Sequence, residues 1–530
     1  MKKLLLLTLF LFSYSANAQK KPALVVGIVV DQMRYEYLTK FFDRYSDKGI
    51  KRLMNEGMNC KDNHYNYAPT VTAAGHASVY TGTVPAVHGI VGNDWIEVAN
   101  GKKMYCTDDT TVQTVGSKSK AGIMSPKNMW TSTITDQLKM AQNYKSKTIA
   151  IALKDRGSIL PGGHTADGAY WYDSAEGYWI TSSFYSKELP AWVQKFNLEG
   201  RPQKYISKGW NTLYPISTYT RSAEDDSPYE SKLPGEKSPT FPHDLKGGNP
   251  LEVLRTTPYG NSLTKDFALK AIEEEKLGKN GTTDFLAISF SSTDYVGHSF
   301  GPQSIEIEDT YLRLDLDIAE ILTYLDTKLG KNQYLVFLTA DHAVAEIPGY
   351  IRSKRLPGGS FDNGKAIADA KTALKNEFGD VEIMAGNDNY QIYLNHKNLE
   401  RLKISKEAVR LVLEKSFKNQ PGFSELVDMR EAATSPLPAL YREMIINGYN
   451  SARSGDFMYL LKPQWFSGFK TGTSHSTVYS YDTHVPLLFF GWNVKPKEIN
   501  QRTNISDISS TLANWLKISE PTGSIGKVIQ

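Results

Sequence analysis

The chain has 530 residues, of which 40% are hydrophobic and 11% aromatic, a composition typical of a packed globular protein. Its 61 basic and 57 acidic side chains give a net charge of +4, and they are spread along the chain without a long basic block. This distribution argues against nucleic acid as a partner.

The first twenty residues read MKKLLLLTLFLFSYSANAQK. Two lysines precede an apolar run at residues 4–12, and the tripeptide Ala-Asn-Ala at 16–18 has the pattern of a signal-peptidase site. We predict a signal peptide over residues 1–18, cut after Ala18, and a soluble mature protein that is periplasmic or secreted. The alternative is a membrane anchor, but a spanning helix needs about 20 apolar residues, so no stable membrane insertion is expected.

The mature chain begins with a continuous apolar, β-branched run at residues 23–30, which is typical of a strand buried on both faces of a parallel sheet. Similar runs follow at 147–154, 283–294, 333–342 and 485–491, with helical patterns between them, such as 304–329. The alternation predicts the α/β class, with a mostly parallel central sheet and helices on both faces. We interpret residues 19–530 as a single catalytic domain.

Two segments interrupt this alternation. Residues 155–260 are rich in Tyr, Trp, Gly and Pro without a clear long helix, and residues 365–470 contain a predicted hairpin followed by a helix at 405–417. We expect both segments to be insertions over the active-site edge of the sheet. The first could select the leaving group or cover the site. Cys60 and Cys106 could pair in an oxidising compartment or remain two separate buried thiols.

Polar residues follow the predicted strands at the points where they end. They are Asp31, Lys154, Asp294 and Asp341. A single polar residue at such a position is usually a turn or a helix cap. Because the carboxyl ends of parallel strands share one edge, where sites form in open α/β sheets, four of them indicate a site.

Histidines accompany these carboxylates. His298 follows Asp294 by four residues, His342 follows Asp341 directly, and His475 lies in the segment GTSHSTVYSYDTHVP. Carboxylate and imidazole together suit Zn²⁺. With Asp31 they provide six ligands, enough for two ions that could hold the attacking and the leaving oxygen of an in-line displacement.

Thr72 stands before a short alanine-rich helical pattern, AAGHASVYTG. A threonine hydroxyl is a poor nucleophile at neutral pH, but coordination to a dication lowers its pKa. Helix N-terminal N–H groups would favour a bound anion beside it. The alternative is that Thr72 only caps this helix.

Two cations and an amide complete the predicted site. Lys154 and Arg156 occur as LKDRG directly after a strand, so both could reach one anion, with Arg gripping two phosphoryl oxygens. Asn93, in HGIVGND, could donate its amide to a further oxygen. The alternatives are a solvated ion pair at a strand exit and an exposed turn asparagine.

These motifs occur in the order DQMR, PTVTAAGH, YTG, HGIVGN, LKDR, STDYVGH, TADH and GTSH with YDTHVPLLFFG. The set resembles the alkaline phosphatase superfamily in its type I phosphodiesterase/nucleotide pyrophosphatase branch. It is most similar to the PafA-type, phosphate-irrepressible periplasmic alkaline phosphatases, over the whole mature chain. The resemblance implies an alkaline-phosphatase-like fold and two zinc ions.

The resemblance further implies the role of each residue. Asp294, His298 and His475 would hold one zinc; Asp31, Asp341, His342 and the nucleophile Thr72 would hold the other; and Asn93, Lys154 and Arg156 would contact the phosphoryl oxygens. His484 competes with His475 as a ligand. We prefer His475 because the family's ligand lies in the GTxH element, although Ser476 stands where the family commonly has Gly.

The expected function is zinc-dependent hydrolysis of phosphate monoesters through a phospho-threonine, releasing inorganic phosphate. A nucleotide pyrophosphatase/phosphodiesterase of the same superfamily is the main alternative, and a non-catalytic zinc- or phosphate-binding relative is a second. The sulfatase motif C/S-x-P-S-R is absent around Thr72, and the transmembrane helices typical of phosphoethanolamine transferases are absent. The sequence identifies neither the natural substrate nor the oligomeric state.

Overall fold

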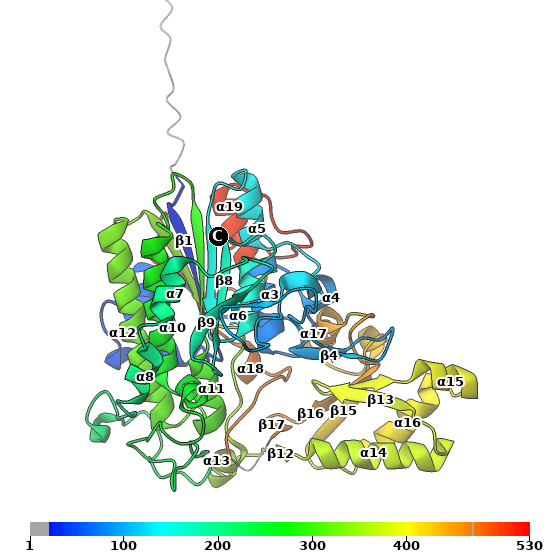
Figure 1. The fold of residues 1–530 in the computed structure, drawn as a ribbon. Helices are drawn as coiled ribbons and strands as arrows, with labels where there is room; N and C mark the ends of the chain where they lie inside the picture. Colours follow the sequence, from blue (N-terminus) through cyan, green and yellow to red (C-terminus); the bar gives the residue numbers. More distant parts are fainter. Residues whose placement is uncertain (1–20, 469–470) are drawn as a thin grey trace, which may run out of the picture.

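The computed structural model describes residues 21–468 and 471–530, so the predicted signal peptide lies outside the described residues. A ten-stranded sheet forms its centre, in the order β19-β2-β18-β11-β1-β10-β7-β8-β9-β6 (Figure 1). Its strands are β1 (Leu24–Val30), β2 (Met58–Cys60), β6 (Thr114–Val115), β7 (Thr148–Ala152), β8 (Gly168–Asp173), β9 (Tyr178–Ser182), β10 (Asp284–Phe290), β11 (Tyr334–Thr339), β18 (Leu487–Gly491) and β19 (Lys497–Ile499).

The five central strands β11, β1, β10, β7 and β8 are parallel to one another. Every residue of β1 and β10 is buried, as their uninterrupted apolar sequences predict. In the register of the sheet, Val30 stands opposite Phe290 and Val29 opposite Thr339. Neighbouring strands therefore end at nearly the same level, and the residues that follow them meet at one edge.

Helices cover both faces of the sheet (Figure 1). One face carries α10 (Pro258–Glu274), which packs on β10, β7 and α12 (Ile305–Lys328). The other carries α3 (Thr72–Thr81), α5 (Ile134–Ala141), α6 (Asp155–Gly162) and α19 (Asp507–Leu516), which contact one another. The predicted α/β class, with a mostly parallel sheet and helices on both faces, is confirmed.

Two details of the sheet differ from the sequence prediction. The run at 485–491 forms β18, which is antiparallel to both β11 and β2 instead of parallel. A continuous apolar run reports burial on both faces but carries no information on strand direction. In addition, β8 and β9, from the first predicted insertion, extend the central sheet.

The segment at 359–461 forms a second layered unit that projects beside the main body (Figure 1, yellow and orange). A four-stranded sheet, β13-β14-β16-β15, packs with α14 (Asn363–Phe378) and α16 (Lys406–Phe417) around its own apolar core. Its strands are β13 (Met384–Asp388), β14 (Gln391–Leu394), β15 (Phe423–Asp428) and β16 (Phe457–Leu461). The predicted hairpin before the helix is the β13–β14 pair.

The two cysteines are separate buried thiols. Cys60 belongs to the main core and Cys106 to a small cluster beside α3. Among the described residues, no helix is both long and apolar enough to cross a membrane.

Candidate active site

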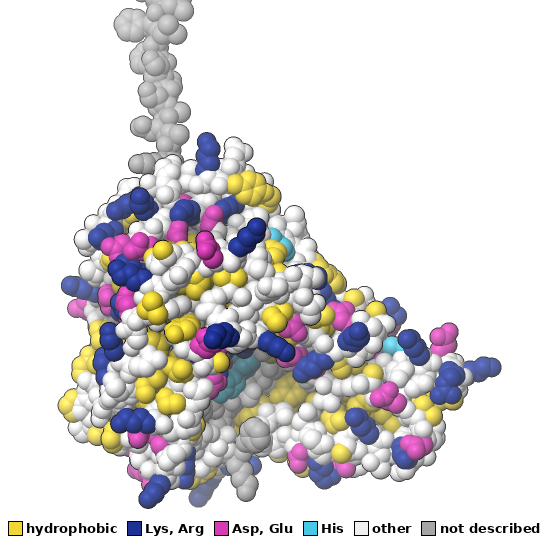
Figure 2. Space-filling view, in the orientation of Figure 1, with side chains coloured by type: hydrophobic (Ala, Val, Ile, Leu, Met, Phe, Trp, Pro, Cys, Tyr) yellow, Lys and Arg dark blue, Asp and Glu magenta, His cyan; other side chains and the backbone are white. Residues whose placement is uncertain are grey.

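The carboxyl ends of the parallel strands bring two groups of possible metal ligands together. One group consists of Asp294, His298 and His475, and the other of Asp31, Asp341 and His342; within each group the ligand atoms lie within 4.8 Å of one another. The groups adjoin, because His342 Nε2 lies 4.0 Å from Asp294 Oδ1 and the His342 and His475 rings stack at 3.6 Å. Figure 2 shows histidine and acidic side chains in the hollow between the main body and the projecting unit.

Each group is assembled from elements that the fold places at this edge. Asp31 directly follows β1, and Asp341 and His342 follow β11. Asp294 and His298 lie one turn apart on α11 (Ser292–Phe300), so both side chains project from the same face of this helix.

The three histidines share one hydrogen-bonding pattern. His298 Nδ1 lies 2.8 Å from the carbonyl of Thr473, His475 Nδ1 lies 2.7 Å from that of Thr70, and His342 Nδ1 lies 2.9 Å from that of Ala343. A carbonyl oxygen only accepts, so each Nδ1 carries the proton. Each Nε2 is therefore left as a lone-pair donor, the form in which histidine binds a metal.

The carboxylates fit the same interpretation. Asp31 Oδ1 and Asp341 Oδ2 are buried and have no hydrogen-bond partner among the described residues. Gln32 orients the neighbours, because its backbone N–H donates to Asp341 Oδ1 at 3.1 Å and its amide to Asp294 Oδ1 at 2.7 Å. Unpartnered buried carboxylate oxygens are costly unless a cation binds them, so the residues present fit metal ions.

Thr72 is the first residue of α3 and faces the second group. Val71 occupies the cap position, and the structure shows no side-chain capping bond at this helix, which argues against the capping alternative. Thr72 Oγ1 lies 3.5 Å from His342 Nε2. Asn93 Oδ1 accepts a hydrogen bond from the N–H of Ala73 at 2.9 Å, which places the Asn93 side chain beside Thr72 with its NH₂ available.

Lys154 is a buried cation between the two groups. Its Nζ lies 2.6 Å from Asp294 Oδ2 and 2.7 Å from Asp31 Oδ2, and the latter contact lacks the angles of a hydrogen bond. Arg156 lies further out, where its guanidinium donates to Tyr105 Oη at 3.1 Å. Tyr105 in turn donates to Asp155 at 2.7 Å.

The pKa values of the site residues reflect their burial and the charges beside them. Burial raises the pKa of Asp341 well above its usual range, and the neighbouring charge of Asp31 adds to the effect. Burial acts the same way on Asp294, but His298 and Lys154 outweigh it and hold its pKa well below the usual range. Burial lowers the pKa of His475, and the neighbouring His342 lowers it further. Buried His475 is thus kept neutral.

All predicted site residues lie around this one edge. His484, by contrast, lies in a separate group with Asp62 and His64, where its Nε2 is 2.8 Å from the carbonyl of Lys61. The structure therefore places His475, and not His484, beside Asp294.

Sequence reasoning did not single out three neighbours of the site. Gln32 follows Asp31 in DQMR, and its position next to a strand-end carboxylate could have marked it. His76 could have been found from its place one turn after Thr72. Its Nδ1 lies 2.9 Å from the carbonyl of Thr72 and its Nε2 2.8 Å from Ser289 Oγ. Tyr105 carries no sequence signal, because it reaches Arg156 only through the fold.

With the fold and the site in place, comparison with known proteins defines the class. The model of the type I phosphodiesterase / nucleotide pyrophosphatase family matches residues 25–485, and the chain belongs to this family. The resemblance noted in the sequence is confirmed.

Individual relatives narrow the comparison. The chain is 46% identical to alkaline phosphatase PafA of Elizabethkingia meningoseptica, over 97% of this chain and 95% of that protein. It is also 46% identical to alkaline phosphatase PhoV of Synechococcus elongatus, over 99% and 98% of the two chains. A Myroides odoratus protein named calcium-transporting ATPase is 50% identical over 98% and 96%. The crystal structure of wild-type PafA matches with a TM-score of 0.94, over 97% of this chain and 99% of that chain.

Proposed function

We propose that this protein is a zinc-dependent alkaline phosphatase that hydrolyses phosphate monoesters through a phospho-threonine at Thr72. The observation that carries the proposal is the pairing of two carboxylate–imidazole groups with a helix N-terminal threonine and the buried cation Lys154 at one edge of the sheet. Near-full-length similarity to PafA and PhoV supports it.

Two ions account for the ligand atoms. Asp294, His298 and His475 would hold one zinc ion, and Asp31, Asp341, His342 and Thr72 the other. When bound, the two ions supply positive charge that lowers the pKa of the Thr72 hydroxyl and neutralises the leaving oxygen. Oxygen and nitrogen ligands without thiolate suit zinc, although cobalt or manganese could replace it in vitro.

The chain's own residues would carry the reaction. Thr72 Oγ1, after losing its proton to solvent, attacks phosphorus; the Oγ1–P bond forms and the bond to the leaving alcohol breaks, and the alcohol takes a proton from water. A water molecule then attacks the phospho-threonine, freeing inorganic phosphate and restoring Thr72. Because the reacting oxygen must be deprotonated, activity should rise toward alkaline pH.

Three side chains would hold the transferred phosphoryl group. The Asn93 amide and Arg156 would donate to its non-bridging oxygens. In the structure, the Lys154 ammonium pairs with the carboxylates of Asp31 and Asp294. Metal ions would bind these carboxylates, and the ammonium would then be available to the phosphoryl group. Two cations match the dianionic charge of a monoester better than that of a diester, which favours a monoesterase over the nucleotide pyrophosphatase/phosphodiesterase alternative.

A substrate panel tests the proposal directly. The zinc-loaded protein is given p-nitrophenyl phosphate, bis(p-nitrophenyl) phosphate and p-nitrophenyl sulfate, before and after chelation. We expect the monoester to be turned over fastest, chelation to abolish turnover, and added zinc to restore it. A zinc-replete protein without turnover would favour a binding protein, and faster diester hydrolysis would favour the phosphodiesterase.

We further propose that the mature protein is exported after removal of residues 1–18 and that its catalytic domain spans 19–530. The basic start, the apolar run at residues 4–12 and the tripeptide Ala-Asn-Ala at 16–18 support this proposal. Identification of the mature N-terminus by peptide mapping tests the cleavage, which should leave Gln19 first.

A further inference from the structure

A small polar pocket adjoins the metal-ligand groups and is not used by the mechanism above. It has a volume of about 260 Å³, and buried His475 is among its lining residues together with Ser474 and Ser476. The opposite wall comes mainly from the projecting unit, through α14, the β13–β14 hairpin and β16, and is completed by β17 (Trp465–Ser467). That wall consists of Asn363, Asn387, Asp388, Asn389, Tyr390, Tyr459 and Ser467.

The pocket lies next to the place where the phosphoryl group would be held. Asn389 Nδ2 donates to the carbonyl of Asp94 at 3.0 Å, and Asp94 directly follows Asn93. One wall of the pocket thus contacts the loop that carries Asn93, and the other contains His475, a proposed ligand of the metal ion that does not bind Thr72. An alcohol attached to the bound phosphoryl group would extend in this direction.

Hydrogen-bonding capacity remains free on the wall. The Asn387 side chain makes no hydrogen bond to another described residue. Asn363 uses its Oδ1 to accept from Tyr459 Oη at 2.5 Å, so its NH₂ stays available, and Asn389 keeps its Oδ1. Tyr390 and Tyr459, whose rings meet edge to face at 5.6 Å, add an aromatic surface. Amides and hydroxyls beside aromatic rings match a compact ring that carries several hydroxyl groups.

The charges argue against an anionic occupant. Asp388 is the only carboxylate among the described residues of the wall. Lys103 lies 3.5 Å from Asp388 and 3.5 Å from Asp94. No lysine or arginine is among the described residues that line the pocket. The volume lies just below the roughly 300–1,000 Å³ of pockets for drug-sized ligands, so one small ring fits.

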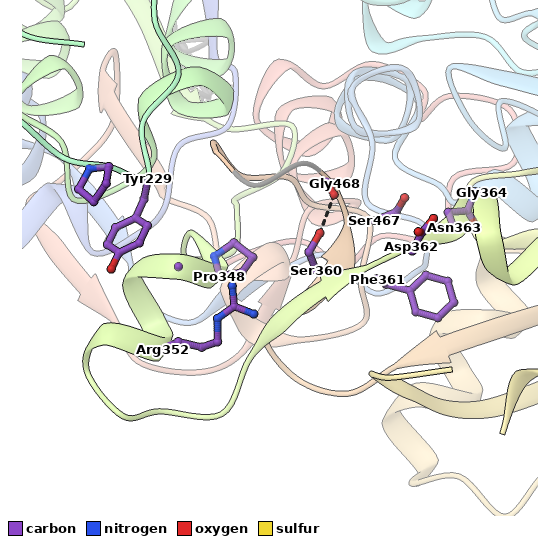
Figure 3. A pocket seen from close by; sticks show the side chains of 12 residues that line it. Tyr229, Pro348, Arg352, Ser360, Phe361, Asp362, Asn363, Gly364, Ser467 and Gly468 are labelled. Carbon is purple, nitrogen blue, oxygen red and sulfur yellow. Dashed lines mark hydrogen bonds between the residues drawn. The ribbon is translucent and has the colours of Figure 1, made fainter. Parts of the chain in front are cut away.

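The pocket adjoins a larger cavity of about 880 Å³, with which it shares Asn363 and Ser467 (Figure 3). Tyr229, Pro348 and Arg352 lie on the other side of this cavity. The occupant of the small pocket would therefore leave through an open space and not through the protein core.

We propose that this pocket binds the leaving group of the substrate and selects a neutral, polyhydroxylated ring, so that sugar phosphates are preferred substrates. This inference rests on the proposed function. It assigns the second inserted unit the task of recognising the alcohol, whereas the sheet edge handles the phosphoryl group.

The test compares substrates with leaving groups of matched shape. Glucose 6-phosphate and cyclohexylmethyl phosphate both release a six-membered ring on a primary alcohol, but the second lacks the ring hydroxyls. 6-Phosphogluconate, an open-chain aldonate, lacks the ring and adds a negative charge. For the zinc-loaded wild type we expect kcat/KM for glucose 6-phosphate to exceed both others by about tenfold, since several hydrogen bonds are lost or a charge is opposed.

Variants then assign the preference to the pocket. Asn387→Ala and Asn363→Ala should each lower kcat/KM for glucose 6-phosphate by about two- to tenfold, the effect of one hydrogen bond, and leave cyclohexylmethyl phosphate unchanged. Asn387→Ala removes no internal bond, so folding should be preserved. Asn419→Ala, at an exposed asparagine two residues after the end of α16, is the control and should change neither value.

The outcomes separate this inference from the proposed function. If neither phosphate ester is hydrolysed by the zinc-loaded protein, the proposed function fails. If the esters are hydrolysed but the wild type shows no preference for glucose 6-phosphate, or both variants lose activity equally on glucose 6-phosphate and cyclohexylmethyl phosphate, the pocket does not recognise the leaving group and the inference is wrong.

Discussion

Lys154 and Arg156 are the two cations proposed to hold the phosphoryl group, and the structure holds them differently. Lys154 is buried against two carboxylates, whereas Arg156 is positioned by Tyr105. Both cations were predicted from the segment LKDRG, because residues that directly follow a strand of a parallel sheet lie at the edge where sites form. The partners that orient them were not predictable, since Asp294 and Tyr105 are brought near only by tertiary structure.

The charge match of these cations gives a prediction at the residue scale. Replacing both by alanine removes two charge-assisted contacts, each worth about 1.5–3 kcal/mol. We expect kcat/KM for p-nitrophenyl phosphate to fall by roughly 10²–10⁴-fold and that for bis(p-nitrophenyl) phosphate to change little. The diester is the internal control for folding and metal content. Equal losses on the two substrates would contradict the assignment as a monoesterase.

The histidine side chains show where residue-scale prediction ends. Their identity and spacing pointed to metal binding, and the structure brings His298, His342 and His475 together. The carbonyls that fix their tautomers belong to Thr473, Ala343 and Thr70. The direction of a backbone carbonyl depends on local φ and ψ, which the residue type does not reveal.

Helix α3 determines where Thr72 lies, and its close approach to the sheet edge depends on Gly75. A Cβ at this position would lie 2.2 Å from the backbone carbonyl oxygen of Asp341. Relieving this clash would require a shift of the backbone of the helix or of the Asp341 segment. Overpacking of this kind costs about 1–3 kcal/mol. The glycine in AAGHAS therefore allows the nucleophile helix to pack directly on a ligand-bearing turn.

The element-scale prediction is that Gly75→Ala displaces Thr72 from the second ligand group. Activity on p-nitrophenyl phosphate should fall by about tenfold or more, because displacements of about 1 Å can cost 10²-fold in rate. The unfolding temperature should also decrease. Gly364→Ala in α14 is the control, since the nearest atom to its added Cβ lies 3.6 Å away. Normal activity in Gly75→Ala would show that this packing does not position Thr72.

A second element, the loop at 225–236, supports the ligand segments through backbone hydrogen bonds. Ser231 N–H donates to Ser299 on α11 at 2.8 Å, and Tyr229 accepts from Gly472 at 2.9 Å. Within this loop, burial raises the pKa of Glu230 to about 10, and the neighbouring charge of Glu306 adds to the effect. Burial opposes protonation of His243, but hydrogen bonds to Glu236 and Glu306 raise its pKa to about 9.

These shifts give a pH dependence of stability. A group with a raised folded-state pKa contributes stability that is complete below its unfolded pKa and is lost as pH rises through the folded value. For Glu230 the loss therefore extends from about pH 4.5 to about pH 10. We expect the unfolding temperature to fall between about pH 8 and about pH 10, and to fall less in Glu230→Gln, which cannot ionise.

Thermal unfolding of the wild type, Glu230→Gln and the exposed control Glu224→Gln at both pH values checks this expectation. The difference between each variant and the wild type isolates the single carboxyl from all other titrating groups. Parallel curves for Glu230→Gln and the wild type would show that Glu230 ionises no later than an ordinary carboxyl.

At the scale of the whole molecule, the order of strands and helices followed from apolar runs and helical periodicity, but two features did not. The direction of β18 was missed because burial alone leaves direction open, and β8 and β9 were hidden in an aromatic-rich segment read as an insertion. Trp171 and Trp179 of these strands are buried in the main core, so their aromatics signal sheet packing.

The projecting unit at 359–461 has its own apolar core. Its β13–β14 hairpin nevertheless reaches the edge of the main sheet where the metal-ligand groups lie. The sequence predicted the hairpin and the helix after it. Their position beside His475 could not be predicted, since it depends on how this unit packs against the main body.

The most direct measurement is to trap the covalent enzyme. The zinc-loaded protein is mixed with a phosphate monoester, quenched in acid within the first turnover, digested and analysed by peptide mass spectrometry. We predict one phosphoryl group on Thr72 in the peptide that contains the start of α3, and none in Thr72→Ala, which should also lose turnover. Undiminished turnover by Thr72→Ala, or a phosphoryl group on another residue of the active wild type, would contradict the account.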